Sequence, residues 1–261
     1  MGAAIVRGLA TSGKIAKESI CATDTAIDRL KELAEEYAIT ALPSNQALVA
    51  QCDVVILAVK PQILFRVLEE VSPTVSASRL FVSIAAGVTT HALEQALPAT
   101  ARIVRTMPNT PAIALASITA IAKGSRTKPE DMDIARFLFE SIGQVVEVDE
   151  SMLDAVTGLS GSGPAYVLLA IEALADGGVR MGLPRQTAQL LAAQTVFGTA
   201  KMVLESNIHP AQLRDNVTSP GGTTIAGLSA LEEGAVRHSF INAVRAATLR
   251  SIELGQLAAN K

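Results

Sequence analysis

The first 150 residues alternate between apolar, strand-like runs and helical segments, and no other feature constrains the fold as strongly. The runs CDVVILAV (52–59) and RLFVSIAA (79–86) are continuously apolar, which is typical of strands that are covered on both faces. Helical patterns lie between such runs, for example over 61–71 and 129–142. This alternation predicts an α/β fold with a doubly wound parallel sheet.

The pattern changes after Asp149, where no further strand candidate occurs and every segment is helical. We therefore expect two domains, an α/β domain over residues 1–149 and an all-helical domain over residues 150–261.

Charge and composition argue against several classes of partner. The chain has 22 basic and 25 acidic residues, so a nucleic-acid partner is not expected. The stretch PAIALASITAIA is too short and too polar to cross a bilayer, and no secretory signal follows Met1, so no membrane partner is expected either. Cys21 and Cys52 lie in or beside apolar runs and are interpreted as buried, reduced thiols of a cytoplasmic protein.

The opening stretch MGAAIVRGLATSG predicts a helix that ends at Gly13. A Rossmann-type fold places the pyrophosphate of a dinucleotide at the start of such a helix, in a G-x-G-x-x-G turn. Gly2 stands where the third glycine of that turn would fall, and Asp24 follows about 20 residues later, where a ribose-binding acid belongs. A single glycine at a helix start is weak evidence, so this interpretation depends on its neighbours.

Three further segments end strands at the same predicted edge of the sheet. They are the stretch from Ala58 to Pro61, the segment SIAAG (83–87) and the segment RTMPNTP (105–111). Ligands of open α/β sheets bind at the carboxyl ends of the strands, so these segments are candidate ligand contacts. Ordinary turns explain them as well, and Asn109 in particular is either a polar ligand contact or a structural turn residue.

The segment DNVTSPGGTTIAGLSALEEG (215–234) carries the sharpest chemical signal. Its Ser-Pro-Gly-Gly-Thr-Thr loop opens a helix, so it offers free backbone N–H groups, hydroxyls and a partial positive charge to a carboxylate or phosphate. Simple capping of the helix by Ser or Thr is the alternative. A second glycine-rich segment, TGLSGSGPAY (157–166), has the letters of a hydrolase elbow but lies between helices, so we interpret it as a helix-packing corner.

The residues that metal or lysine chemistry needs are sparse. His91, His209 and His238 form no metal-ligand spacing, so no metal is expected. Lys201 is the single candidate for a lysine acid or base in the helical half, and a surface position is the simpler interpretation.

Read in order, AVKP, SIAAGV, MPNTP, TGLSGSGPAY and DNVTSPGGTTI closely resemble the pyrroline-5-carboxylate reductase family over essentially the whole chain. The resemblance implies a Rossmann domain followed by a helical dimerisation domain, a homodimer that assembles further into a decamer, and a small-molecule substrate. It also implies the last step of proline biosynthesis, in which NADPH or NADH reduces the imine 1-pyrroline-5-carboxylate to L-proline.

The resemblance also assigns site residues. It implies that Ser219, Thr223 and Thr224 bind the substrate carboxylate and ring nitrogen, with Thr224 as the catalytic residue, and that Glu150 lies near the substrate. Positions that match cofactor contacts, besides Gly2 and Asp24, are Asn45, Ala58, Val59, Lys60, Pro61, Ala86 and Asn216. Asp24 departs from relatives that carry Ser or Thr there, and an acid at this position favours NADH over NADPH. We leave the preference open.

Family members begin with a strand and a GxGNMG-like turn, so we expect the natural protein to be longer at its N-terminus. Two alternatives stay open. A β-hydroxyacid-dehydrogenase-like oxidoreductase would use a catalytic lysine in the helical domain, and a non-catalytic ligand-binding protein would follow if the missing strand were genuine.

Overall fold

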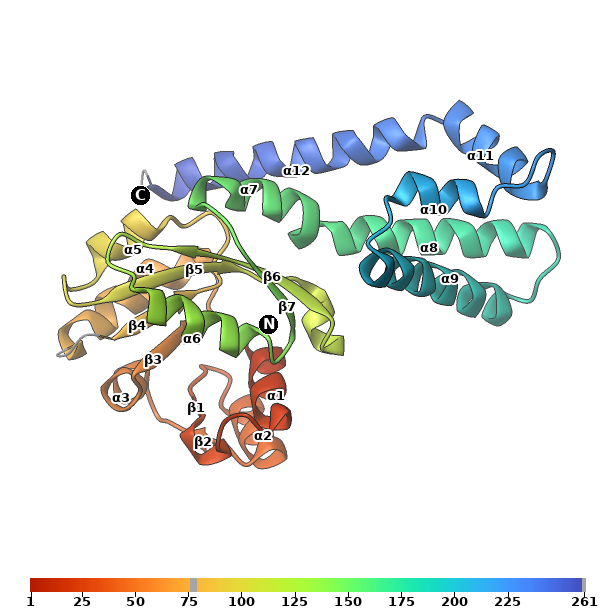
Figure 1. Cartoon of the computed structure of the whole chain (residues 1–261). Helices are drawn as coiled ribbons and strands as arrows, with labels where there is room; N and C mark the ends of the chain where they lie inside the picture. The colour runs from red at the N-terminus through yellow and green to blue at the C-terminus, as the bar shows by residue number, and fades with distance from the viewer. Residues whose placement is uncertain (76–78, 260–261) are drawn as a thin grey trace. The chain divides into compact units, whose positions relative to one another are not determined.

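The fold was analysed in a computed structural model that describes residues 1–75 and 79–259. The chain forms two compact units (Figure 1). The first is made of Met1–Ser162 with Arg245–Lys261, and the second of Gly163–Val244. The compact units do not divide the chain at residue 149, because the first unit runs to Ser162 and also includes the end of the chain. The division into domains at residue 149 stays a prediction.

The first unit alternates helices and strands as the sequence predicts. Its regular elements are α1 (Gly2–Ser12), β1 (Cys21–Ala22), α2 (Ile27–Tyr37), β2 (Thr40–Ala41), α3 (Asn45–Gln51), β3 (Val54–Leu57), α4 (Pro61–Val71), β4 (Leu80–Ser83), α5 (Thr90–Ala96), β5 (Arg102–Met107), β6 (Ser117–Lys123), α6 (Pro129–Phe139), β7 (Gly143–Glu147) and α7 (Leu153–Val156). Short 3-10 turns η1 (Lys17–Ser19), η2 (Ser72–Thr74), η3 (Thr110–Ala114) and η4 (Glu150–Met152) and a π-turn η5 (Thr157–Gly161) complete it.

The strands form two sheets, a parallel pair β1–β2 and a five-stranded sheet in the order β3-β4-β5-β6-β7. The prediction of a parallel sheet holds for every pairing except one, because β6 runs antiparallel to β5. The link between β5 and β6, residues 108–116, holds only the turn η3. A parallel crossover needs a dozen or more residues, so this short link returns the chain in the opposite direction.

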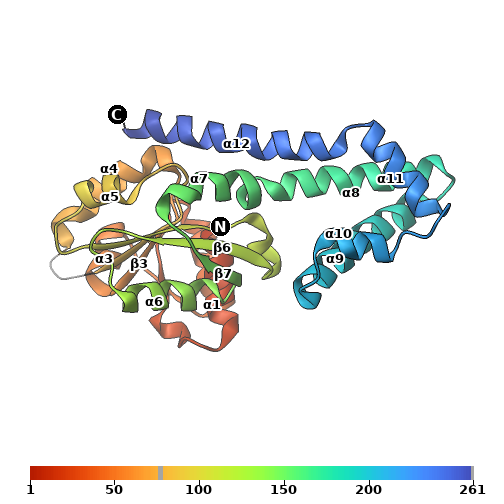
Figure 2. The ribbon, with the colours of Figure 1, turned by 45° about the horizontal axis from the view of Figure 1, so that its top comes forward.

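Helices cover the two faces of the five-stranded sheet (Figure 2), and an apolar core lies on each face. Alternate strand residues separate them: Leu80 and Val82 point to α1 and α6, while Phe81 points to α3, α4 and α5. Successive side chains of a strand face opposite ways, so strands buried on both faces read as continuous apolar runs. This arrangement confirms the doubly wound α/β class.

The predicted opening helix is confirmed as α1, and Gly13 ends it in the left-handed conformation at φ 67°. Sequence patterns missed α3 and β2. Ser44 caps α3 by accepting a hydrogen bond from the Ala47 N–H at 3.1 Å, a signal that the sequence did contain.

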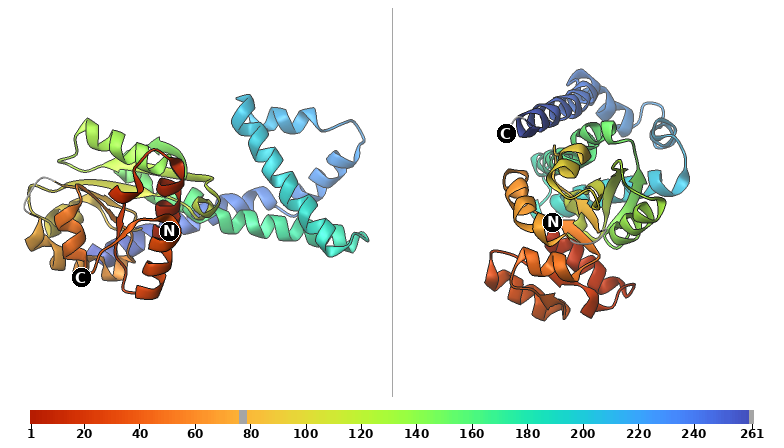
Figure 3. Two further views of the ribbon diagram at one scale, coloured as in Figure 1. Left: turned by 90° about the horizontal axis from the view of Figure 1, so that it is seen from below. Right: turned by 90° about the vertical axis from the view of Figure 1, so that its left-hand side faces the viewer.

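The second unit consists of helices joined by loops (cyan to blue in Figure 3). They are α8 (Gly163–Arg180), α9 (Arg185–Ser206), α10 (Pro210–Asn216), α11 (Thr223–Glu233) and the first part of α12 (Val236–Ala259). Its buried apolar cluster comprises Ala175, Ala188 and Ala192 alone among the described residues. Such a core is too small to fold 82 residues without other apolar contacts.

The helices of the second unit instead expose large apolar side chains. Leu169 is 67% exposed, Leu190 70% and Met181 82%. By length and composition, the described segment Glu150–Arg180 is apolar enough to span a membrane, and only 11% of its most apolar window is buried within the chain. The sequence stretch considered above, PAIALASITAIA, was therefore not the relevant one.

Candidate nucleotide and substrate site

The start of α1 lies against the carboxyl end of β3, as a dinucleotide site requires. A Cβ on Gly2 would approach the Ala58 Cβ to 3.3 Å, so a side chain there would fill the space at the helix start. Lys60 is the N-cap of α4 and Pro61 its first residue, which confirms the predicted strand-to-helix turn. The absence of a side chain at Gly2 beside Ala58 thus leaves space at the helix start, as a bound pyrophosphate would need, and Lys60 two residues further on is exposed.

Asp24 follows β1 and is exposed. Its Oδ1 accepts a hydrogen bond from the Ala26 N–H at 2.9 Å, which orients the carboxylate at the start of α2. No described residue donates a hydrogen bond to Oδ2, so this oxygen can accept one from a ribose hydroxyl. Asn45, by contrast, already donates its Nδ2–H to Glu70 Oε2 at 3.1 Å.

The loop between β4 and α5 presents Ala86 to solvent between the buried residues Ala85 and Gly87. Gly87 adopts a left-handed φ of 76°, which favours glycine. Ala86 and Thr89 are the exposed residues of this loop, and Ala86 is the one that the resemblance assigns to the cofactor.

Asn109 is a structural residue in this fold. Its side chain is 8% exposed, its Oδ1 accepts hydrogen bonds from Ser117 Oγ (3.0 Å) and the Ile118 N–H (3.1 Å), and its Nδ2 donates to the Ser160 carbonyl (3.1 Å). Of the two interpretations of Asn109, the structural turn is therefore correct. The Ser160 carbonyl belongs to the π-helical turn η5, which lies between α7 and α8. A Cβ on Gly161 would lie 2.6 Å from the Met107 methyl group, so the glycine-rich segment packs closely between helices, as the packing-corner interpretation expects.

Glu150 is engaged within the first unit. Its Oε1 accepts from the Thr90 N–H at 2.6 Å and from Arg105 at 3.1 Å, and its Oε2 accepts from the Thr90 hydroxyl at 2.6 Å. The Arg105 side chain is only 6% exposed, so Glu150 supplies the counter-charge of a buried guanidinium.

The Ser-Pro-Gly-Gly-Thr-Thr loop belongs to the second unit and opens α11. Gly221 adopts φ 66°, and a Cβ at Gly222 would collide with Ser219 Oγ. Gly222 is itself the N-cap, and no side chain caps the helix, so the simple capping alternative is wrong. The loop leaves the Ser219 and Thr223 side chains exposed and Thr224 half-buried.

The remaining predicted residues of the second unit do not gather around a lysine or a metal. Asn216 ends α10 and accepts a hydrogen bond from Gln212 at 3.1 Å. Lys201 is an exposed residue whose Nζ lies 3.7 Å from Glu205, which confirms its surface position. The described residues contain no group of three His, Cys, Asp or Glu side chains that could hold a metal ion.

Cys21 and Cys52 are free and half-buried rather than buried. Burial, together with the neighbouring Cys21, raises the pKa of Cys52 above its ordinary value to about 11.

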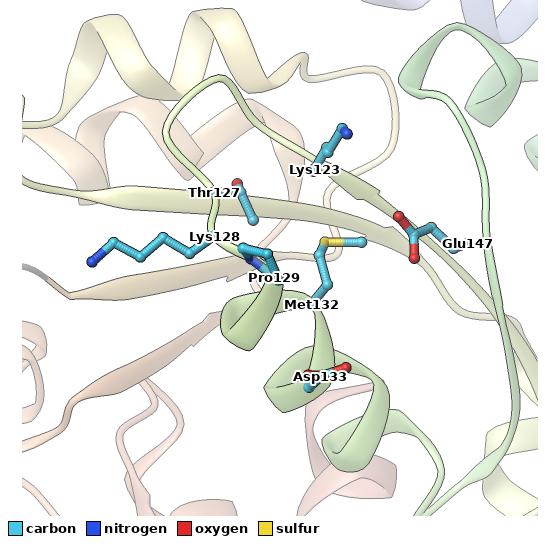
Figure 4. A pocket seen from close by; sticks show the side chains of 7 residues that line it. All are labelled: Lys123, Thr127, Lys128, Pro129, Met132, Asp133 and Glu147. Atoms are coloured by element: carbon cyan, nitrogen blue, oxygen red, sulfur yellow. The ribbon is translucent and has the colours of Figure 1, made fainter.

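A hollow on the first unit lies at the start of α6, away from the predicted rim. It has a volume of about 280 Å³ and is lined by both acidic and basic side chains (Figure 4). Lys123, Lys128 and Glu147 are among them, and none of its lining residues was predicted for the site.

Two family models of known proteins match this chain. The family described as "NADP oxidoreductase coenzyme F420-dependent" matches residues 1–87, and "Pyrroline-5-carboxylate reductase dimerisation" matches residues 150–254. Pyrroline-5-carboxylate reductases of Methanosarcina acetivorans and Synechocystis are 46% and 48% identical, each over 98% of this chain and 95% of that protein.

Solved structures of the same family have a similar fold. The pyrroline-5-carboxylate reductase of Coxiella burnetii has a TM-score of 0.91 at 38% identity and covers 97% of this chain and 94% of its own. The Plasmodium falciparum enzyme, solved with NADP bound, has a TM-score of 0.87 at 34% identity and covers 98% of this chain and 94% of its own.

The fold and the site define an NAD(P)H-dependent oxidoreductase in which a Rossmann-type unit precedes a helical dimerisation region. Within that class, the chain belongs to the pyrroline-5-carboxylate reductase family.

Proposed function

We propose that the protein reduces the imine 1-pyrroline-5-carboxylate to L-proline with NADPH or NADH, the last step of proline biosynthesis. One observation of this chain carries the proposal: the Ser219–Thr224 loop, in which Gly221 adopts a left-handed φ and Gly222 has no side chain, so that the first turn of α11 is open to an anion. Relatives named for this activity match almost the entire chain.

The residues divide the work between the two units. Gly2, Asp24, Asn45, the segment 58–61 and Ala86 of the first unit hold the dinucleotide, and Gly2 with Ala58 leaves room for its pyrophosphate. Asn216 of the second unit stays a predicted cofactor contact. When bound, the reduced nicotinamide supplies the hydride.

The α11 loop binds the substrate. The backbone N–H groups of the first turn, with the hydroxyls of Ser219 and Thr223, bind the carboxylate. The hydroxyl of Thr224 hydrogen-bonds the ring nitrogen, which carries its own proton, so no lysine or histidine acid is needed. Orientation of the imine is thus the main contribution of the protein.

The assembly follows from the exposed apolar helices. The dimerisation family that matches residues 150–254 supports a homodimer, and burial of Leu169 and Leu190 against a second copy supplies the core that the helical unit lacks. We extend this to a decamer built from five such dimers in the cytoplasm, with no membrane or nucleic-acid partner. The apolar segment Glu150–Arg180 packs in this account against protein rather than lipid.

The test measures steady-state oxidation of NADH and NADPH with 1-pyrroline-5-carboxylate. A second assay measures reduction of NAD⁺ and NADP⁺ with small β-hydroxyacids. We expect turnover of the imine alone. Turnover of a hydroxyacid that disappears in Lys201→Ala would support the dehydrogenase alternative instead.

A further inference from the structure

The β4–α5 loop is held from two sides by residues that flank the helical half of the chain. Glu150 precedes that half, and Gly255 lies near the end of its last helix, α12. Both contact residues 87–90, immediately after Ala86. All of these residues belong to the first compact unit.

The contact from α12 is a close approach of two backbones. A Cβ on Gly255 would lie 2.9 Å from the Gly87 carbonyl oxygen, and a Cβ on Gly87 would lie 3.3 Å from the Gly255 nitrogen. Only glycine permits this distance, so a larger residue at position 255 must displace the loop or the helix. The last part of α12 runs beside α7, where Ser251 Oγ donates to Asp154 Oδ1 at 2.6 Å (Figures 1 and 2).

The contact from Glu150 is polar. Its carboxylate receives both the N–H and the hydroxyl of Thr90, the first residue of α5, and a charge-assisted bond from Arg105. A carboxylate at a helix N-terminus also interacts favourably with the helix dipole. Glu150 therefore fixes the end of the loop while Gly255 fixes its middle.

We propose that Glu150 and Gly255 are positioning residues that hold the β4–α5 loop, and with it Ala86, in the shape that receives the dinucleotide. The inference rests on the proposed function for the role of Ala86. It assigns Glu150 to the cofactor loop, although the family resemblance places this residue near the substrate.

The experiment compares Glu150→Gln and Gly255→Val with two matched controls on the full chain. Glu147→Gln removes the charge of a nearby exposed carboxylate, and Gln256→Val adds the same branched side chain one residue further along α12 at an exposed position. Titration of NADH and NADPH fluorescence gives the cofactor Kd without imine present, and thermal unfolding reports the fold of each variant.

We expect both loop variants to weaken cofactor binding about tenfold, with the controls within about twofold of the wild type. In turnover, the cofactor KM should rise while the imine KM stays unchanged. An unchanged Kd in both folded variants would overturn the inference, and an unchanged Kd in one would remove that residue from it. A rise in the imine KM alone for Glu150→Gln would also overturn it, in favour of a substrate contact.

These readouts separate the inference from the proposed function. A wild-type protein that binds cofactor but does not reduce the imine would contradict the function, while the Kd comparison would still decide the role of the loop.

Discussion

The two compact units bury apolar surface in different ways. The α/β unit packs large side chains such as Phe81 and Phe139 into cores on both faces of its sheet, whereas the helical unit buries three alanines and exposes its leucines. Hydrophobic burial is the dominant favourable term in folding, so the first unit can be stable by itself and the second depends on association. The comparison shows that this chain joins a unit with its own apolar cores to a helical unit whose apolar faces stay exposed within one chain.

The largest effect should come from a charge on the exposed apolar face of the helical unit. Leu169→Glu would place a carboxylate in the dimer interface, so we expect complete loss of the dimer and loss of helical structure. Light scattering gives the mass and circular dichroism the helix content. The matched control is Ile134→Glu on α6 of the α/β unit, which is 37% exposed and should leave the mass unchanged. A dimeric Leu169→Glu protein would contradict the contrast between the units.

A cavity in the core of the sheet should lower the free energy of unfolding of the α/β unit without dissociating the dimer. We expect this effect to be smaller than that of Leu169→Glu. Phe139 is fully buried against α1 and the sheet, so Phe139→Ala should lower the free energy of unfolding by about 3–5 kcal/mol. Ala188→Gly in the helical unit removes only a methyl group and should cost about 1 kcal/mol. Denaturant titration measures the free energy of unfolding of both variants. Equal losses would contradict the proposed difference between the cores of the two units.

The catalytic contribution of the helical unit can be tested apart from its folding. Thr224→Val keeps the shape of the side chain and removes the hydroxyl, so we expect the imine kcat to fall about 100-fold. Thr218→Val, whose hydroxyl donates to the Arg214 carbonyl just before the loop, is the control and should keep most of the activity. If Thr224→Val retained the wild-type kcat, the role proposed for this hydroxyl would be wrong.

The smallest expected effect is the slow reaction of the Cys52 thiol in the α/β unit, together with its contribution to the pH dependence of stability. The pKa of Cys52 is raised to about 11, chiefly by burial, so its thiol stays neutral at physiological pH and should react slowly with iodoacetamide. Because the folded pKa lies above the unfolded one, the stability linked to this thiol is present at lower pH and is lost as the pH rises through about 11. Mass spectrometry of the alkylated protein measures the rate at which iodoacetamide labels Cys52, and Cys52→Ala is the control. Rapid labelling at Cys52 at neutral pH would contradict the assignment.

Most of the fold was predictable because hydrophobic periodicity records which faces are buried. The runs before Pro61 and around Phe81 predicted strands, and the apolar spacing over 61–71 and 129–142 predicted the helices α4 and α6, the second of which ends at Phe139. The antiparallel β6 was not predicted, since its direction depends on the length of a link rather than on any pattern in the strand.

The site was predictable to a lesser extent. The glycines at 221 and 222 indicated an open helix start, and in the structure Gly221 has a φ of 66° and no side chain caps α11. The partners of Glu150 and the approach of Gly255 to Gly87 join residues that are distant in sequence, so no local pattern could reveal them. The roles of the predicted site residues remain predictions.

The most direct test of the account is to follow the hydride itself. The protein is incubated with 1-pyrroline-5-carboxylate and NADH or NADPH deuterated at the transferable position, and the product is analysed by mass spectrometry and chiral chromatography. The account predicts L-proline that carries one deuterium. Absence of proline, or proline without the label, would contradict it.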